Sequence, residues 1–288
     1  MKLKVLIFTL FAGSLGAAEL RVDHATVCGA DLKKMQAAMM DVGIATEYGG
    51  PHSNHATEMA LTSFPDGSYL EQIAIQPKGD PKAIDAHEWS KQMKGNAGPC
   101  AWAVRPGDIK AEVKRLQPKI QVTPPEPAGR NLPDGTRLDW ETSQVGSVAR
   151  GTFYPFLIRD ITPRAARAFP SGKPTAPEFS GIAKVVIAVR ALDDAIVRYR
   201  KTYDLPEPKM QIDEVFDAKL AWFEGTPLIL AATNGVPSWL NTRLSNFGEG
   251  PCAYILKGST TPVSQTRWFG TPVKWFDTVT LGWRLGVE

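Results

Sequence analysis

Residues 98–102 have the sequence Gly-Pro-Cys-Ala-Trp, and residues 250–254 repeat it as Gly-Pro-Cys-Ala-Tyr. Four of the five positions are identical, and the offset (250 − 98 = 152) is about half of the 288-residue chain. Self-similarity at a fixed offset is typical of a duplicated structure. Because a Gly-Pro turn before a strand is also common on its own, the surrounding pattern must support the duplication.

The residues around the repeat form a pattern of one strand, one helix and further strands. Strand-like runs that end at Cys28, Val104 and Val189 are each followed by an aspartate and then by apolar residues at helical spacing. This spacing predicts a helix with one face against a sheet, and an aspartate in front of it is a favoured N-cap. The aspartates expected to cap the helices are Asp31, Asp108 and Asp193.

Strand-like runs follow each predicted helix, so the repeating unit is predicted to be βαβββ. The expected strands are 46–50, 57–64 and 68–75 in the first unit, 137–142 and 151–158 in the second, and 210–216, 220–224 and 228–232 in the third. Turns are expected at Pro65-Asp66-Gly67 and Pro133-Asp134-Gly135. A fourth unit starts at Ala253 and lacks the helix, and residues 268–285 are expected to form strands only.

The N-terminal residues have the features of a secretory signal peptide. Lys2 and Lys4 precede a short apolar stretch, and small residues end at Ala18, where cleavage is expected. An uncleaved anchor is the less favoured alternative, because a membrane span needs about 20 apolar residues. We therefore expect a secreted or periplasmic protein that is not held in a membrane after cleavage.

The proline content suggests where the chain divides. Residues 162–180 contain four prolines among small and charged residues, which predicts a linker over 161–180. The first domain is then expected at 19–160 and a second, degenerate unit at 181–288. The fold class predicted is α+β, with duplicated tandem βαβββ modules.

Composition narrows the classes of partner. The chain is 43% apolar and 22% charged, as in an ordinary globular protein, and its formal charge is only +3. It has no basic run and no aromatic-basic motif of the kind that binds nucleic acid. We therefore expect a small-molecule ligand and no nucleic-acid partner.

The three cysteines are Cys28, Cys100 and Cys252. An odd number allows at most one intramolecular disulfide, and export would permit one. None of the spacings is that of a zinc site. The preferred interpretation is that all three are small buried residues on strands, and which pair would join is left open.

His24 and Glu71 are the first candidates for a functional site. His24 lies in the first predicted strand and Glu71 in the last strand of the same unit. The two side chains can therefore face each other across one small sheet. A neutral imidazole and a carboxylate are two of the three protein ligands of a common divalent-metal site.

With these modules in view, the chain resembles the glyoxalase-like domain family of the vicinal oxygen chelate (glyoxalase/bleomycin resistance/dioxygenase) superfamily. The resemblance is strongest over residues 20–160. The segments that carry it are Asp23-His24, Gly49-Gly-Pro-His52, Gly67-Ser-Tyr-Leu-Glu71, Arg130-Asn-Leu-Pro-Asp-Gly-Thr-Arg-Leu-Asp-Trp140 and Tyr154-Pro-Phe-Leu-Ile158. The resemblance implies βαβββ modules paired into cupped mixed sheets, and a small-molecule enzyme or binder. The chain departs from the family's Gly-Thr-x-Asn pattern at Ala56 and Met59.

The resemblance also implies a test for a metal site. Metal-binding members of the superfamily take ligands from the first and last strands of paired modules. Counting back seven residues from each helix-cap aspartate reaches His24 in the first unit but Ala101 and Val186 in the next two, and the repeat places Ala253 in the fourth. A metal would therefore need His24, Glu71 and a third ligand from the first unit. His52 is the best candidate, His55 is another, and Asn54 and Glu58 are weaker ones. The alternatives are a metal-free pocket, in which His24 and Glu71 act as general acid and base, and a purely structural buried pair.

Three further residues are candidates for the ligand pocket, and two others, His87 and Asp134, are expected to lie outside it. Arg130 can bind a carboxylate through its guanidinium group, or it can be a solvated turn residue. Trp102 and Trp140 can line an apolar pocket or pack in the core. His87 lies in a polar, helix-like stretch and is expected to face solvent, and Asp134 is expected to serve only its turn.

The expected function is that of an exported glyoxalase-like small-molecule enzyme, with His24 and Glu71 as catalytic residues and His52, Arg130, Trp102 and Trp140 binding the substrate. A divalent metal on His24, His52 and Glu71 would allow lyase, isomerase or dioxygenase chemistry on an oxygenated substrate. The alternative is a metal-free protein that binds or sequesters a small molecule. A third hypothesis is a structural or interaction module, in which the duplicated half buries a face of the first and side chains fill the concave face of residues 20–160.

Overall fold

The structure is a computed structural model that describes residues 20–132, 135–235, 238–261 and 263–288. The predicted signal peptide and the first two residues of the Pro133-Asp134-Gly135 turn lie outside these ranges. In the described part of the chain, no helix is both long enough and apolar enough to cross a membrane.

Sixteen strands of the described residues form two eight-stranded mixed sheets. The first sheet has the order β2-β3-β4-β1-β5-β8-β7-β6 and the second has the order β10-β11-β12-β9-β13-β16-β15-β14. The strands of the first sheet are β1 (Val22–Gly29), β2 (Glu47–Pro51), β3 (Thr57–Ser63), β4 (Tyr69–Ile75), β5 (Gly98–Val104), β6 (Glu126–Asn131), β7 (Arg137–Ser143) and β8 (Phe156–Asp160). Those of the second are β9 (Phe179–Ala188), β10 (Lys209–Asp213), β11 (Ala218–Trp222), β12 (Leu228–Thr233), β13 (Gly250–Gly258), β14 (Ser264–Trp268), β15 (Thr271–Trp275) and β16 (Arg284–Val287).

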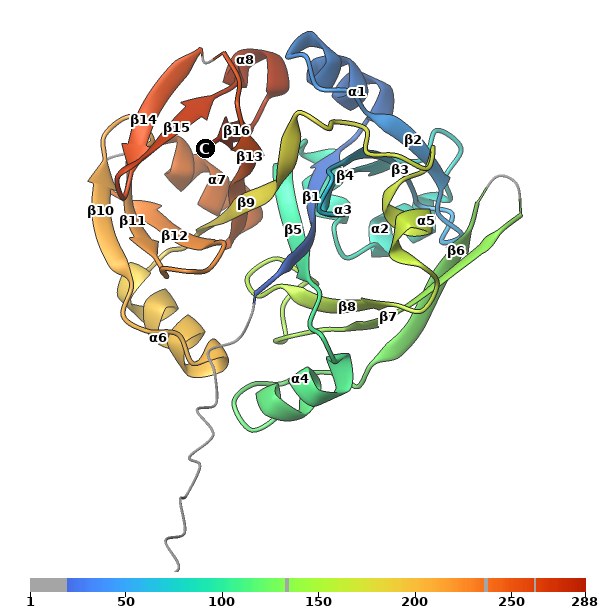
Figure 1. The fold of residues 1–288 in the computed structure, drawn as a ribbon, viewed down its shortest axis with the longest axis horizontal. Helices are drawn as coiled ribbons and strands as arrows, with labels where there is room; N and C mark the ends of the chain where they lie inside the picture. The colour runs from blue at the N-terminus through green and yellow to red at the C-terminus, as the bar shows by residue number, and fades with distance from the viewer. Residues whose placement is uncertain (1–19, 133–134, 236–237, 262) are drawn as a thin grey trace, which may run out of the picture.

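The two sheets have the same strand order, and this confirms the predicted fold class of duplicated βαβββ modules. In each sheet a central antiparallel pair, β1 with β5 or β9 with β13, joins two modules, and each of these strands also pairs in parallel with the last strand of its module. Figure 1 shows the two sheets side by side. The strands β5 and β13, which begin with the two copies of the repeat, contact each other.

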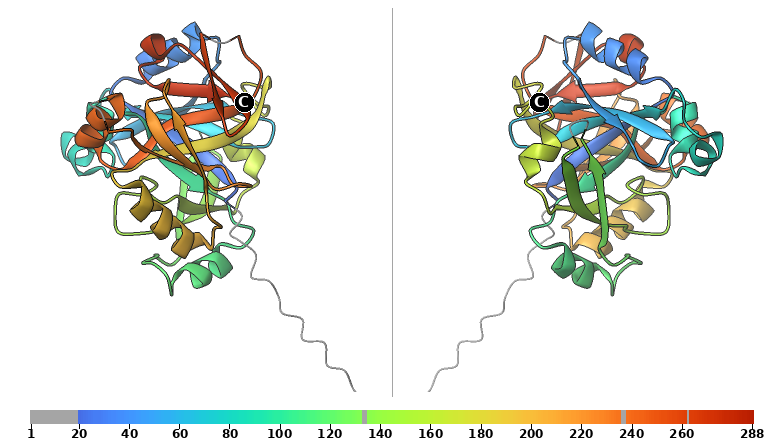
Figure 2. Two further views of the ribbon diagram at one scale, coloured as in Figure 1. Left: turned by 90° about the vertical axis from the view of Figure 1, so that its left-hand side faces the viewer. Right: turned by 90° about the vertical axis from the view of Figure 1, so that its right-hand side faces the viewer.

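Eight helices of the described residues surround the sheets. They are α1 (Leu32–Asp41), α2 (Pro81–Ala86), α3 (Ser90–Lys94), α4 (Ile109–Leu116), α5 (Arg164–Ala168), α6 (Leu192–Tyr203), α7 (Trp239–Phe247) and α8 (Thr278–Leu281). Figure 2 shows α1 and α8 at one end of the molecule, and α4 and α6 at the opposite end. The helices α1, α4 and α6 are those of the first three modules, and β13 runs to β14 without one, as predicted.

Two of the three predicted N-cap aspartates are N-caps in the structure. Asp31 and Asp108 accept hydrogen bonds from backbone amides in the first turns of α1 and α4, so both are the predicted N-caps. The prediction for Asp193 is wrong, because α6 begins one residue earlier, at Leu192, and has Ala191 at its N-cap. Asp193 instead lies in the first turn, where its charge still complements the helix dipole.

Three other predictions of elements need correction. The strand β6 was not expected, because Pro127 and Gly129 are disfavoured in strands, although an edge strand can hold both. The strand expected at 151–158 starts only at Phe156, since Gly151 has a left-handed φ of 69° that a strand does not use. The short helix α8 interrupts residues 268–285, where only strands were expected.

The two halves share one hydrophobic core, and the repeated segments lie at its centre. Trp102 and Tyr254, the last residues of the two copies, are both fully buried in this core. The Tyr254 hydroxyl lies 2.8 Å from the carbonyl oxygens of Thr26 and Ala101 in the first sheet. Arg243 donates to the carbonyl oxygens of both repeat prolines, Pro99 and Pro251. The repeat therefore corresponds to the contact between the halves.

Candidate functional site

A cavity of about 280 Å³ lies in the first sheet, and alternate residues of its strands form the walls. Because successive side chains of a strand point to opposite faces, residues two apart share a face. The sets that line the cavity are Met59 and Leu61 on β3; Tyr69, Glu71 and Ile73 on β4; Ala128 and Arg130 on β6; Trp140 and Thr142 on β7; and Phe156 and Ile158 on β8. Every set has this spacing of two, so one continuous face of the curved sheet forms the site.

His24 lies on β1 at the centre of this sheet and is 4% exposed. Its ring stacks on Tyr69, with a centroid distance of 4.9 Å and an interplanar angle of 3°, and meets the edge of Phe156 at 5.3 Å. The Nδ1 atom lies 2.7 Å from Oδ1 of Asp23, and Nε2 lies 3.8 Å from Oε2 of Glu71. The imidazole is therefore held on three sides, and its Nε2 is directed toward Glu71.

The carboxylate of Asp23 decides which nitrogen of His24 carries the proton. Asp23 is fully buried, and Arg164 and Arg167 both form ion pairs with it. Burial alone would raise the pKa of Asp23, but the two guanidinium groups and the hydrogen bond to His24 hold this pKa well below its usual range. An ionised carboxylate can only accept hydrogen bonds. His24 therefore donates from Nδ1, and in the neutral ring Nε2 has the free lone pair.

Arg167 uses its donors on neighbouring protein groups. Its Nε donates to Asp160 at 2.5 Å, Nη1 to the Tyr69 hydroxyl at 2.5 Å and Nη2 to Asp23 at 3.0 Å. Burial lowers the pKa of Arg167, but the charges and hydrogen bonds around it outweigh burial and raise this pKa well above its usual value. Arg167 and Arg164 both belong to α5, so the segment expected to be a linker supplies the cations that fix Asp23 and, through it, His24.

His52 lines the cavity, and Thr57 fixes the orientation of its ring. Its Nδ1 lies 2.7 Å from Oγ1 of Thr57, and burial lowers its pKa. His55 is exposed and does not line the cavity.

The predicted metal ligands do not come together as a set of three. The structure brings His24 and Glu71 together, but in the described part of the chain no group of three or more His, Cys, Asp or Glu side chains is arranged to hold a metal ion. A catalytic metal site usually has three protein ligands. The lining also includes Arg130, Arg150 and Arg167, whose charges oppose a bound cation. The donor set therefore does not fit the divalent metal that the sequence suggested.

Arg130 connects the two edges of the curved sheet. It belongs to the edge strand β6, yet its Nη1 donates at 2.5 Å to the carbonyl oxygen of Gly49 in the opposite edge strand, β2. Arg130 is 6% exposed and lines the cavity, so it is not the solvated turn residue of the alternative interpretation. Burial lowers its pKa.

Of the two candidate tryptophans, the structure places only Trp140 at the cavity. Trp102 is fully buried in the core shared by the two halves, so the prediction that it binds the substrate is wrong. The reason is the alternation of β5, which directs Trp102 away from the face that carries Ala101 and Ala103.

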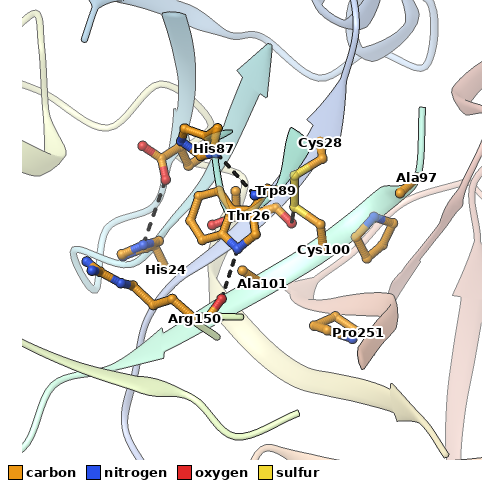
Figure 3. Close-up of a disulfide and its surroundings, with 12 residues drawn as sticks. His24, Thr26, Cys28, His87, Trp89, Ala97, Cys100, Ala101, Arg150 and Pro251 are labelled. Atoms are coloured by element: carbon orange, nitrogen blue, oxygen red, sulfur yellow. Dashed lines mark hydrogen bonds and ion pairs between the residues drawn. A yellow bond between two sulfur atoms is a disulfide. The ribbon is translucent and has the colours of Figure 1, made fainter. Parts of the chain in front are cut away.

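The segment that contains α2 and α3 forms one wall of the cavity. His87 lines the cavity and is half-buried, so the expectation that it faces solvent is wrong. Its Nδ1 accepts a hydrogen bond from the backbone amide of Trp89, whose indole Nε1 donates to the carbonyl oxygen of Arg150 at 2.9 Å (Figure 3). Burial lowers the pKa of His87.

A disulfide joins the two central strands of the first sheet. Cys28 on β1 and Cys100 on β5 are bonded, with a Cα–Cα distance of 5.8 Å, and Figure 3 shows this bridge farther along the strands from His24. All three cysteines are buried on strands, as expected, and the pairing that the sequence left open is Cys28 with Cys100. Cys252, which occupies the position of Cys100 in the second copy of the repeat, is buried and free.

Aromatic side chains fill the corresponding face of the second sheet. Phe216, Trp268 and Trp275 pack together with ring centroids 4.9 to 5.4 Å apart. The buried carboxylate of Asp213 accepts hydrogen bonds from the Trp268 indole and from the Phe216 amide. The structural hypothesis required side chains to fill the concave face of residues 20–160, and the cavity in the first sheet contradicts it.

Sequence reasoning missed several residues around His24. Tyr69 precedes Glu71 by two positions, so strand alternation was a signal for Tyr69, whereas Asp23 is adjacent to His24 and alternation alone would place it on the opposite face. No local signal identified Arg164, Arg167 or Trp89, because these residues reach the site through contacts that are distant along the chain.

The comparisons with known proteins agree with this architecture. A hypothetical protein from Staphylococcus aureus matches with a TM-score of 0.63 and 14% identity, covering 93% of this chain and 98% of that one. A mutant of 4-hydroxymandelate synthase from Streptomyces coelicolor matches with a TM-score of 0.53 and 14% identity, covering 84% of this chain and 72% of that one. A xylose isomerase-like TIM barrel/4-hydroxyphenylpyruvate dioxygenase fusion protein matches with a TM-score of 0.55 and 12% identity, covering 98% of this chain and 50% of that one.

At these identities the likeness shows the fold alone, which is the fold of the vicinal oxygen chelate superfamily. No curated protein matches the sequence. The glyoxalase-like domain family, however, matches residues 22–203, which is more than half of the chain and includes the residues around the cavity. The resemblance seen in the sequence is thereby confirmed, and the chain belongs to the glyoxalase-like domain family.

Proposed function

We propose that this chain is a small-molecule enzyme that moves a proton on an oxygenated substrate bound in the cavity of the first sheet. The observation that carries the proposal is the line of groups Asp23, His24 and Glu71, in which Nε2 of His24 lies 3.8 Å from Oε2 of Glu71. That distance is longer than the donor–acceptor distance of a hydrogen bond, which is about 2.7 to 3.2 Å. The two groups are thus close enough to act on one substrate, and 3.8 Å is too long for a hydrogen bond between them.

The chemistry follows from the protonation of these groups. Nε2 of neutral His24 takes a proton from a carbon next to a carbonyl group, and the electron pair of the broken C–H bond moves onto the carbonyl oxygen as an enolate. Ionised Asp23 stabilises the imidazolium through the Nδ1 proton. The proton then returns from His24 to another atom of the same substrate, which gives an isomer with no net change in atoms or charge. Glu71 is the second group that can carry this proton.

The proposal uses no metal, because the side chains present do not complete a metal site. The sequence-based hypothesis of metal-dependent lyase, isomerase or dioxygenase chemistry required His52 as a third ligand, and this residue does not form a metal-binding group with His24 and Glu71 among the described residues. Proton transfer by His24 and Glu71 supports the isomerase class, for which the two side chains suffice.

Replacing His24 with glutamine tests the proposal. Small ketones and oxo acids, including butanone and levulinate, are incubated with the protein in D2O, and deuterium at the carbon next to the carbonyl is followed by NMR. The wild type is expected to accelerate exchange for at least one compound, and His24→Gln to slow it by about 10²- to 10⁴-fold, the usual contribution of a general base.

His55→Asn is the control, because His55 is exposed, lies outside the cavity lining and has a positive φ of 57° that asparagine tolerates. It should exchange at the wild-type rate. Equal rates for the wild type and His24→Gln would show that His24 is not the base.

The alternative function is metal-free binding or sequestration of a small molecule. The observation that favours it is the apolar part of the lining, which includes Ile73, Phe156 and Ile158. Under this alternative, a ligand binds stoichiometrically without proton exchange, and His24→Ala retains most of the affinity.

We also propose that the protein is exported, to the periplasm or outside the cell. The Cys28–Cys100 disulfide supports this proposal, because disulfides persist mainly in oxidising compartments. Mass spectrometry of protein from the producing cells should find a mature chain that begins at Glu19. A chain that keeps Met1 and stays in the cytoplasm would contradict export.

A further inference from the structure

We propose that the cavity selects substrates with a single carboxylate group, and that Arg130 binds this group. The inference rests on the proposed function, because it names the substrate class of the same site. Arg130 is 6% exposed, lines the cavity and uses Nη1 for the Gly49 carbonyl oxygen. Its Nη2 is buried and has no hydrogen-bond partner among the described residues.

The other two arginines of the lining are already paired. Arg167 forms hydrogen bonds with Asp160, Tyr69 and Asp23. Arg150 forms an ion pair with Glu88, and its guanidinium carbon lies 5.7 Å from the centre of the Phe156 ring. Arg130 is therefore the lining arginine that has no carboxylate partner among the described residues, although Nε of Arg150, like Nη2 of Arg130, makes no hydrogen bond there. A buried charge without a partner is costly, so an anionic ligand group at Nη2 would remove part of this cost.

The remaining lining identifies the anion as a monocarboxylate. A guanidinium NH2 group fits a carboxylate oxygen, and hydrogen bonds between charged partners are the strong ones. Glu88 is paired with Arg150, but Glu71 also lines the cavity and would repel a doubly charged anion such as phosphate more strongly than a singly charged one. One arginine without a carboxylate partner, beside one carboxylate, matches a ligand with one negative charge better than one with two.

The size and the apolar walls describe the rest of the ligand. The cavity of about 280 Å³ is slightly smaller than the range for small-molecule sites, about 300 to 1,000 Å³. Met59, Leu61 and Ile158 supply aliphatic contacts, and Phe156 and Trp140 supply aromatic ones. The ligand expected is thus a small organic acid with an apolar body, of about the size of benzoate.

Binding of benzoate and benzamide, measured by isothermal titration calorimetry, tests this inference. The two probes have nearly the same shape, but only benzoate is charged, and neither has an acidic proton on a carbon next to its carbonyl group. The wild type is expected to bind benzoate about 10- to 100-fold more tightly than benzamide, as for a hydrogen bond between charged groups. Arg130→Met should lower the benzoate affinity to that of benzamide and leave benzamide binding unchanged.

Arg137→Met is the matched control, because Arg137 is exposed on the neighbouring strand β7 and lies outside the lining. It should keep the preference for benzoate. If Arg130→Met does not fold, the neutral polar variant Arg130→Gln replaces it, and a loss of benzoate affinity with unchanged benzamide binding is then expected. Benzoate binding that is unaffected in these Arg130 variants, or inorganic phosphate that binds more tightly than benzoate, would overturn the inference.

The inference and the proposed function can fail separately. His24→Gln should still bind benzoate in preference to benzamide, since Arg130 is unchanged, although it no longer exchanges protons. A charge preference that depends on Arg130, in a wild type that exchanges no substrate, would support the carboxylate site and argue against the enzyme. His24-dependent exchange without a preference for benzoate would support the enzyme and overturn the carboxylate site.

Discussion

Arg167→Met is expected to lower the free energy of unfolding by about 3 to 5 kcal/mol, the usual effect of removing one partner from a buried ion pair. Methionine retains much of the volume of the arginine side chain but none of its donors. Asp23 would lose one of its two cationic partners, and the buried Tyr69 hydroxyl would lose the donor that it accepts from. Chemical denaturation monitored by circular dichroism measures the change.

The control for this variant is Arg159→Met in the strand β8. Arg159 is about half exposed, and its guanidinium group lies 3.8 Å from Glu141, a separation at which a surface pair contributes little. Its replacement should change the unfolding free energy by less than about 0.5 kcal/mol. Equal effects of the two substitutions would show that the contacts of Arg167 with Asp23 and Asp160 do not stabilise the protein.

Removing the disulfide is the second change with a large expected effect. The bridge joins cysteines that are 72 positions apart, and a loop of this length gives about 4 kcal/mol in the chain-entropy account of disulfides. The double variant Cys28→Ala/Cys100→Ala should therefore unfold with a free energy lower by about 4 kcal/mol. Wild-type protein unfolded in the presence of a reductant should lose a similar amount.

Cys252→Ala is the matched control, because Cys252 is equally buried but forms no disulfide. It removes one sulfur atom from the core, and a loss of about 1 kcal/mol is expected, near the average for single substitutions. A double variant that is no less stable than Cys252→Ala would show that the bridge does not contribute to stability.

The sequence was sufficient to predict the features that depend on local periodicity. Apolar residues three to four positions apart predict the helices after Asp31 and Asp108, and apolar residues at every second position predict the strands β3 and β4. The pairing of His24 with Glu71 followed from their places in the first and last strands of one module.

The features that could not be predicted depend on where distant segments meet. Arg130 reaches Gly49 only because the sheet curves until its two edge strands approach each other, and no local pattern records this curvature. The disulfide partner of Cys28 depends on the register of β1 against β5. This register places Cys28 opposite Gly98, two positions before Cys100. Trp102 was assigned to the pocket because an aromatic residue fits either face of a strand, and only the packing of the second half shows which face it takes.

The position of α5 affects how the protein can be divided. A fragment that ends at residue 160 would contain all eight strands of the first sheet but neither Arg164 nor Arg167. Asp23 would then be an ionised carboxylate with no cation beside it, next to the histidine that it orients. A fragment that keeps the site must therefore extend beyond the sheet that carries it. A truncation designed from strand boundaries alone would remove the arginines that hold Asp23, which determines which nitrogen of His24 carries the proton.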